Sequence, residues 1–135
     1  MKKTFAIAAL FVTALAGTAF AGDNYKLTVS PATAKVNEKA VAKVSVEATG
    51  KYHVNKEYPA KLIIDDAGGL TVESTKITKD KAAKLTDKEL AFDVGFTATK
   101  AGKSEIKATL KFGVCLEDQA CEAKTETVVL KVEAK

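Results

Sequence analysis

The chain contains no arginine and no tryptophan, and its 135 residues include one histidine and two cysteines. Nucleic-acid sites usually depend on arginine for bidentate phosphate and guanine contacts, and they gather their basic residues on one face. The 21 basic residues here are all lysines, and they are scattered among carboxylates. We therefore expect a solvated charged surface and no nucleic-acid partner.

A long hydrophobic run occurs at the N-terminus. Lys2 and Lys3 precede an apolar stretch at residues 4–15, and a small-x-small motif, Ala-Phe-Ala, follows at residues 19–21. This order is typical of a secretory signal peptide, and the stretch is short for a membrane span. We predict cleavage after Ala21, export to a bacterial periplasm, and a mature protein that is not embedded in the membrane.

Cleavage would divide the chain into a signal peptide, residues 1–21, and a mature domain, residues 22–135. Loss of Lys2 and Lys3 lowers the formal net charge from +4 to +2. The remaining 114 residues suffice for one hydrophobic core and are too few for two. We expect one near-neutral domain, and we expect it to be a monomer.

Period-two alternation of apolar and polar residues dominates the mature chain. This pattern predicts strands that place one row of side chains in a core and the other row in water. The predicted strands span residues 25–29, 40–48, 61–64, 70–74, 90–98, 106–112 and 127–132. The side chains predicted to face the core along the four longest strands are Ala42, Val44, Val46, Ala48, Leu90, Phe92, Val94, Phe96, Ala98, Ile106, Ala108, Leu110, Phe112, Val128, Leu130 and Val132.

About seven short strands, separated by turn sequences such as Thr49-Gly50, are typical of an all-β, immunoglobulin-like antiparallel β-sandwich. The tryptophan and inter-sheet cysteine pair of antibody domains are absent, so we predict the architecture without membership of the antibody family. Residues 75–89 interrupt the alternation and are rich in lysine and aspartate. We expect a long polar connection there, with a helical turn around residues 81–85.

The two cysteines, Cys115 and Cys121, lie between a strand predicted to end near Phe112 and a strand predicted to begin near Thr125. A hairpin would place them across its neck, where their Cα atoms can approach to the roughly 4.4–6.8 Å of a disulfide. An exported compartment permits the bond. One interpretation is a stabilising disulfide. A ring of about seven residues is worth only roughly 2.4 kcal/mol in the chain-entropy model, so exchange with an attacking thiolate is the second interpretation.

The surroundings of the cysteines are acidic in the sequence, with Glu117, Asp118 and Glu122 beside them. Negative charge should raise the pKa of both thiols, so we expect a passive partner of another protein's activated thiolate. Two cysteines and the lone His53 lack the spacing of a zinc site, and we predict no metal. A Cys–His pair would form only if the fold brings His53 to the hairpin tip.

The segment FGVCLEDQAC at residues 112–121, followed by EAKTETV at 122–128, resembles the N-terminal periplasmic domain of the thiol:disulfide interchange protein DsbD. In that family a glycine shortly precedes the first cysteine, and a strand rich in Lys, Glu and Thr follows the second. The segment GKYHVN at residues 50–55 is similar to the family segment that brings tyrosines near the cysteines. The resemblance covers residues 25–135.

The resemblance implies that Cys115 and Cys121 cycle between disulfide and dithiol, with Tyr52 as an auxiliary residue and without a cofactor. In the family, the domain takes electrons from a membrane-embedded conduit and reduces thioredoxin-fold periplasmic proteins. This chain departs from the family pattern at Asn55, where a second tyrosine is expected, and at Glu122, where aromatic and proline residues often follow the cysteine.

Two functions therefore stand open at the level of sequence. The first is an exported thiol–disulfide exchange domain, a reductant relay with interchange activity at Cys115 and Cys121. The second is a non-enzymatic periplasmic binding or structural module whose disulfide only stabilises a hairpin. The order in which the two cysteines react does not follow from the sequence.

Overall fold

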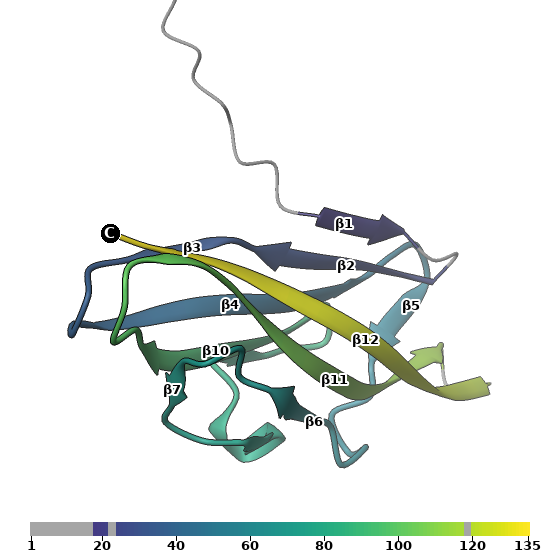
Figure 1. The fold of residues 1–135 in the computed structure, drawn as a ribbon. Coiled ribbons are helices and arrows are strands. Elements are labelled where there is room, and N and C mark those ends of the chain that lie inside the picture. Colours follow the sequence, from purple (N-terminus) through teal and green to yellow (C-terminus); the bar gives the residue numbers. More distant parts are fainter. Residues whose placement is uncertain (1–17, 22–23, 118–119) are drawn as a thin grey trace, which may run out of the picture.

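The computed structural model describes residues 18–21, 24–117 and 120–135, most of which lie in β-strands (Figure 1). No α-helix occurs in these ranges, and a single 3-10 turn spans Lys79–Lys81. The strands form two sheets that pack as an immunoglobulin-like sandwich. The predicted all-β fold class is confirmed.

The first sheet has β4 and β10 at its centre, and all of its described strand pairs are antiparallel. Its strands, in spatial order, are β1 (Thr18–Ala21), β2 (Tyr25–Ser30), β4 (Lys39–Ala48), β10 (Glu89–Thr97) and β7 (Thr71–Val72), with β9 (Lys84–Leu85) also paired to β10.

The second sheet is built around one long hairpin, β11 and β12, whose two strands run the length of the sandwich (Figure 1). Its strands, in spatial order, are β3 (Ala32–Ala34), β12 (Ala120–Ala134), β11 (Gly102–Leu116), β6 (Lys61–Asp66) and β8 (Lys76–Thr78), with β5 (Tyr52–Val54) paired to the far end of β11. Only the β3–β12 pair is parallel among the described pairs of this sheet.

The core lies between the two sheets and contains every side chain that the alternation predicted to be buried. Phe92, Phe96 and Phe112 are each at most 1% exposed and are the largest of these side chains. Burial of such apolar surface is the main favourable contribution to folding. The period-two interpretation of the four longest strands is therefore confirmed.

The predicted helical turn at residues 81–85 is wrong. The 3-10 turn lies earlier, at Lys79–Lys81, and Lys84–Leu85 form β9. β8 and β9 contain only three and two residues, too few for alternation to be visible in the sequence. They form because they pair with the edges of β6 and β10, which are contacts made only in the folded chain.

The predicted signal peptide falls largely outside the described residues. Its last four residues, Thr18–Ala21, pair with β2 and place Ala21 opposite Lys26. Cleavage after Ala21 stays a prediction. Within the described ranges, no helix has the length and apolar character needed to cross a membrane.

Candidate functional site

Cys115, near the end of β11, and Cys121, near the start of β12, stand directly opposite each other in the hairpin ladder. They form a disulfide with their Cα atoms 4.0 Å apart. The predicted placement across the neck of a hairpin is confirmed. The two residues differ in accessibility, since Cys115 is only 4% exposed and Cys121 is exposed.

The strand β5 places His53 beside this disulfide. His53 pairs in register with Cys115, which in turn pairs with Cys121. Residues paired across antiparallel strands project from the same face, with Cβ atoms about 4.5–5.5 Å apart. His53, Cys115 and Cys121 therefore form one row across three neighbouring strands, which we call the cysteine row.

The three residues of β5 are held on both edges. β11 pairs with one edge, and on the other the amide of Val54 donates a hydrogen bond to the carbonyl of Asp87 at 2.7 Å. The ammonium group of Lys88 donates to the carbonyls of Gly50 and Tyr52, at 3.0 and 2.6 Å. These contacts satisfy the backbone of a strand that is too short to be stable alone, and they fix the position of His53.

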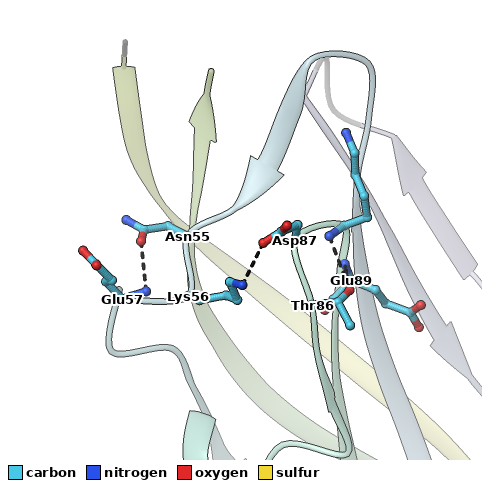
Figure 2. Close-up of polar contacts among 7 residues, drawn as sticks. Asn55, Lys56, Glu57, Thr86, Asp87 and Glu89 are labelled. Atoms are coloured by element: carbon cyan, nitrogen blue, oxygen red, sulfur yellow. Dashed lines mark hydrogen bonds and ion pairs between the residues drawn. The ribbon is translucent and has the colours of Figure 1, made fainter. Parts of the chain in front are cut away.

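The cysteine row lines a shallow hollow of about 360 Å³ that Asn55, Lys56 and Asp87 also line. Lys56 reaches across to Asp87, and its Nζ lies 2.8 Å from Oδ1 (Figure 2). The hydrogen bond and the charge of Lys56, with a smaller contribution from the charge of His53, lower the pKa of Asp87. The hollow is therefore lined by a carboxylate, an ammonium group and an imidazole next to the disulfide.

An aromatic side chain packs beside the cysteine row, and it comes from Tyr58. Asn55 Oδ1 accepts hydrogen bonds from the amides of Glu57, at 3.0 Å (Figure 2), and Tyr58, at 3.3 Å. This turn brings Tyr58 against Gly113, where an added Cβ would lie 3.0 Å from Tyr58 Cβ and Cγ. Gly113 shares a face with Cys115, two residues on. Sequence reasoning missed Tyr58, although a glycine inside a strand is a signal of such a close approach.

Tyr52, the predicted auxiliary residue, lies elsewhere. It pairs with Leu116, in the row after Cys115, and it packs against the core. Successive residues of a strand project to opposite faces, so the face that carries His53 cannot also carry Tyr52. The structure brings His53 beside Cys115 and Tyr58 against Gly113, and it does not bring Tyr52 to the face of the cysteines.

The expected acidic surroundings are wrong for Glu122. This residue follows Cys121 and projects to the other face, where it accepts a hydrogen bond from Asn24 Nδ2 at 2.8 Å. It also forms an ion pair with Lys124 at 3.0 Å, and the hydrogen bond and charge of Lys124 lower the pKa of Glu122, with a smaller contribution from Asn24. Glu117 occupies the exposed turn, and Asp118 lies outside the described residues.

Within the described ranges, no group of three His, Cys, Asp or Glu residues is arranged to hold a metal ion. The chemistry available at the hairpin tip is that of the disulfide. Cys121 is the exposed residue of this disulfide, and its buried partner Cys115 is paired in register with His53.

No known protein-family model matches the chain, and no curated protein sequence matches it. Among solved structures it is similar to domains 4 and 5 of the S-layer protein SbsC, with 13% identity and a TM-score of 0.41 over 87% of this chain and 46% of that one. It thus spans about half of that structure's length.

Two further solved structures are similar to the chain. One is the PapD-like domain 7 of human CEP192, with 10% identity and a TM-score of 0.41 over 92% of this chain and 95% of that chain. The other is a family 123 glycoside hydrolase from Clostridium perfringens, with 6% identity and a TM-score of 0.34. The match covers 78% of this chain and 22% of that one. With identities of 13% or less and TM-scores below 0.5, these structures assign neither a family nor a function to the chain.

Proposed function

We propose that this protein is an exported thiol–disulfide exchange domain that relays electrons through Cys115 and Cys121. The observation that carries the proposal is the asymmetry of the disulfide: Cys121 is exposed at an open hollow, and Cys115 is buried beside a histidine. Exchange requires one sulfur that an external thiolate can reach and a second that can leave. The resemblance of residues 112–128 to the DsbD N-terminal domain supports the same function.

The proposed step conserves electrons and protons. The thiolate of a partner dithiol attacks Sγ of Cys121, so a mixed disulfide forms while the Cys115–Cys121 bond breaks and Cys115 leaves and takes up a proton. The partner's second thiolate then attacks the partner sulfur of the mixed disulfide, and Cys121 leaves and takes up a proton. The partner dithiol is oxidised by two electrons, and this domain ends as a dithiol.

A purely stabilising role is disfavoured by the position of the bond. β11 and β12 pair along their full fifteen-residue lengths, so the ladder closes the hairpin without the disulfide. The roughly 2.4 kcal/mol that the chain-entropy model assigns to a seven-residue ring is then an upper value. A bond joining distant strands would restrict the unfolded chain more.

We further propose that the protein acts in a bacterial periplasm, after removal of residues 1–21. Its partners there would be thioredoxin-fold proteins and a membrane electron conduit, as in the DsbD family. The hollow beside Cys121, with the Lys56–Asp87 pair on its rim, is the surface that such a partner would cover.

The reduction potential tests the proposed function. We expect the purified mature domain to equilibrate with a glutathione redox buffer and to have a potential above about −300 mV. A disulfide that stays fully oxidised across the glutathione range would support the structural module instead.

Single-cysteine variants test whether the two sulfurs differ in accessibility. Cys115→Ser and Cys121→Ser both remove the disulfide, so each is the matched control of the other. We expect oxidised glutathione to form a mixed disulfide with Cys115→Ser, through Cys121, at least tenfold faster than with Cys121→Ser, as followed by mass spectrometry. Equal rates would mean that the two sulfurs are equally accessible and would contradict the asymmetry on which the proposal rests.

A further inference from the structure

The chain has one histidine, and the fold places it directly opposite the buried cysteine of the disulfide. His53 and Cys115 are register partners on adjacent strands, 62 positions apart in the sequence. The backbone that carries His53 is held by β11 on one side and by residues 87 and 88 on the other. The imidazole is half-buried and lines the same hollow as both cysteines.

The position of His53 matters because the thiolates of Cys115 and Cys121 differ in how they can be stabilised. Cys121 is exposed, and water can solvate its thiolate. Cys115 is 4% exposed, and burial disfavours a charged sulfur. A thiolate that leaves at Cys115 therefore requires a proton or a positive charge from the protein, and histidine is the side chain whose charge changes between pH 5 and 8.

The other charged groups around His53 have partners of their own or lie on the rim. Lys56 and Asp87 pair with each other, and the ammonium group of Lys88 is bound by two backbone carbonyls. Glu57 lines the rim of the hollow, and Glu117 lies in the exposed turn beyond Leu116. While Cys121 is held in the mixed disulfide with the partner, the imidazole is the one group of the cysteine row that can exchange a proton with Cys115.

We propose that His53 is the acid–base partner of Cys115 in the exchange reaction, an inference that rests on the proposed function. As an imidazolium it donates a proton to the Cys115 thiolate when the disulfide breaks. In the reverse direction the neutral imidazole accepts the proton of the Cys115 thiol, and the resulting thiolate attacks Sγ of Cys121 in the mixed disulfide and expels the partner's thiolate. Electrons move only between sulfurs, and His53 moves the proton.

The test compares wild type with His53→Gln, and Lys51→Gln is the control. Lys51 is exposed, lies two residues from His53 and does not line the hollow, so this control removes a nearby charge without touching the cysteine row. Reduction by dithiothreitol is followed from pH 5 to 8, with rates divided by the thiolate concentration of the reagent. We expect His53→Gln to lower this rate by about tenfold at the acid end, since general acid–base catalysis contributes at least that much.

A spectroscopic measurement accompanies the rates. Thiolate absorbance at 240 nm reports the titration of reduced Cys115 in a Cys121→Ser background. We expect His53→Gln to raise the pKa of the Cys115 thiol by about one unit, because a neighbouring imidazolium favours the thiolate. Lys51→Gln should leave both the pH profile and the thiol titration unchanged.

The outcomes separate this inference from the proposed function. A wild-type disulfide that exchanges readily, with identical pH profiles in wild type and His53→Gln, would overturn the role of His53 alone. A wild-type potential far below the glutathione range would overturn both. If His53→Gln does not fold, the imidazole of wild type is titrated by NMR in the oxidised and reduced proteins, and a titration curve that does not respond to reduction contradicts the inference.

Discussion

The middle of the sandwich and the tip of the β11–β12 hairpin are built from the same two strands, yet on β12 the inward row changes from buried apolar side chains to partly exposed charged ones. In the middle, the inward row of β12 is apolar and includes Val128 and Leu130, which are at most 2% exposed. Toward the tip the same row continues with Glu122, Lys124 and Glu126.

Polar contacts replace apolar burial at the tip. Asn24 donates to Glu122, and the hydroxyl of Tyr25 donates to Glu126, while the Tyr25 ring meets Phe112 edge-on with centroids 5.0 Å apart. The comparison shows that burial of apolar side chains determines the fold in the middle. At the tip, a few polar contacts hold the hairpin in place and leave the disulfide next to solvent.

Of three substitutions that test this comparison, one in the core on β12 should reduce the free energy of unfolding most. Leu130 is fully buried, and we expect Leu130→Ala to reduce the free energy of unfolding by about 2–5 kcal/mol, because it removes apolar contacts and leaves a cavity. Urea denaturation followed by circular dichroism measures the loss. Thr127→Ala, at an exposed position of the same strand, is the control and should change the free energy by about 0.5 kcal/mol or less. Similar losses in both variants would contradict the claim that burial of apolar side chains determines the fold in the middle of the sandwich.

Next in size is the effect of adding a methyl group at the tip. Gly113→Ala would place a Cβ 3.0 Å from Tyr58 Cβ and Cγ, and we expect a loss of about 1–3 kcal/mol from this overpacking. Chemical denaturation of Gly113→Ala, Tyr58→Ala and the double variant forms a double-mutant cycle. Because alanine at position 58 keeps Cβ but removes Cγ and the ring, it relieves part of the clash, and the double variant should lose less than the sum of the single losses. An additive result would mean that Tyr58 does not pack on Gly113.

The smallest of the three effects concerns the polar contact between Tyr25 and Glu126. Tyr25→Phe removes one hydrogen bond, and we expect a loss of about 1 kcal/mol near neutral pH. The pKa of Tyr25 is raised to about 12. Burial of the phenol is the largest cause, followed by the hydrogen bond to Glu126 and by the negative charge of Glu126. The folded protein thus favours the neutral phenol more than the unfolded chain does.

This shift predicts a pH dependence with a definite sign. The stability that depends on the neutral Tyr25 phenol is fully present below about pH 10, the ordinary pKa of tyrosine, and is lost as the pH rises toward 12. Urea midpoints measured between pH 9 and 12 should therefore fall more steeply for wild type than for Tyr25→Phe. Parallel curves would show that Tyr25 does not titrate differently in the folded state.

The main strands and the core were predictable because alternation is a local property of the chain. Each residue of β4 or β10 needs only its neighbours in the sequence to be assigned to one face, and Phe92 and Val44 are buried as expected. β5 was missed because three residues carry too little pattern, and its strand partner lies about sixty residues away in β11.

The sequence by itself determined the sandwich, its core rows and the placement of Cys115 opposite Cys121 across a hairpin. Only the tertiary structure decided that His53 meets Cys115, that Tyr58 covers Gly113 and that Glu122 turns away from the sulfurs. The physical reason is that the alternation of faces is set within each strand, whereas the register between distant strands is set by the packing of the whole sheet. The chemistry at the hairpin tip depends on that register.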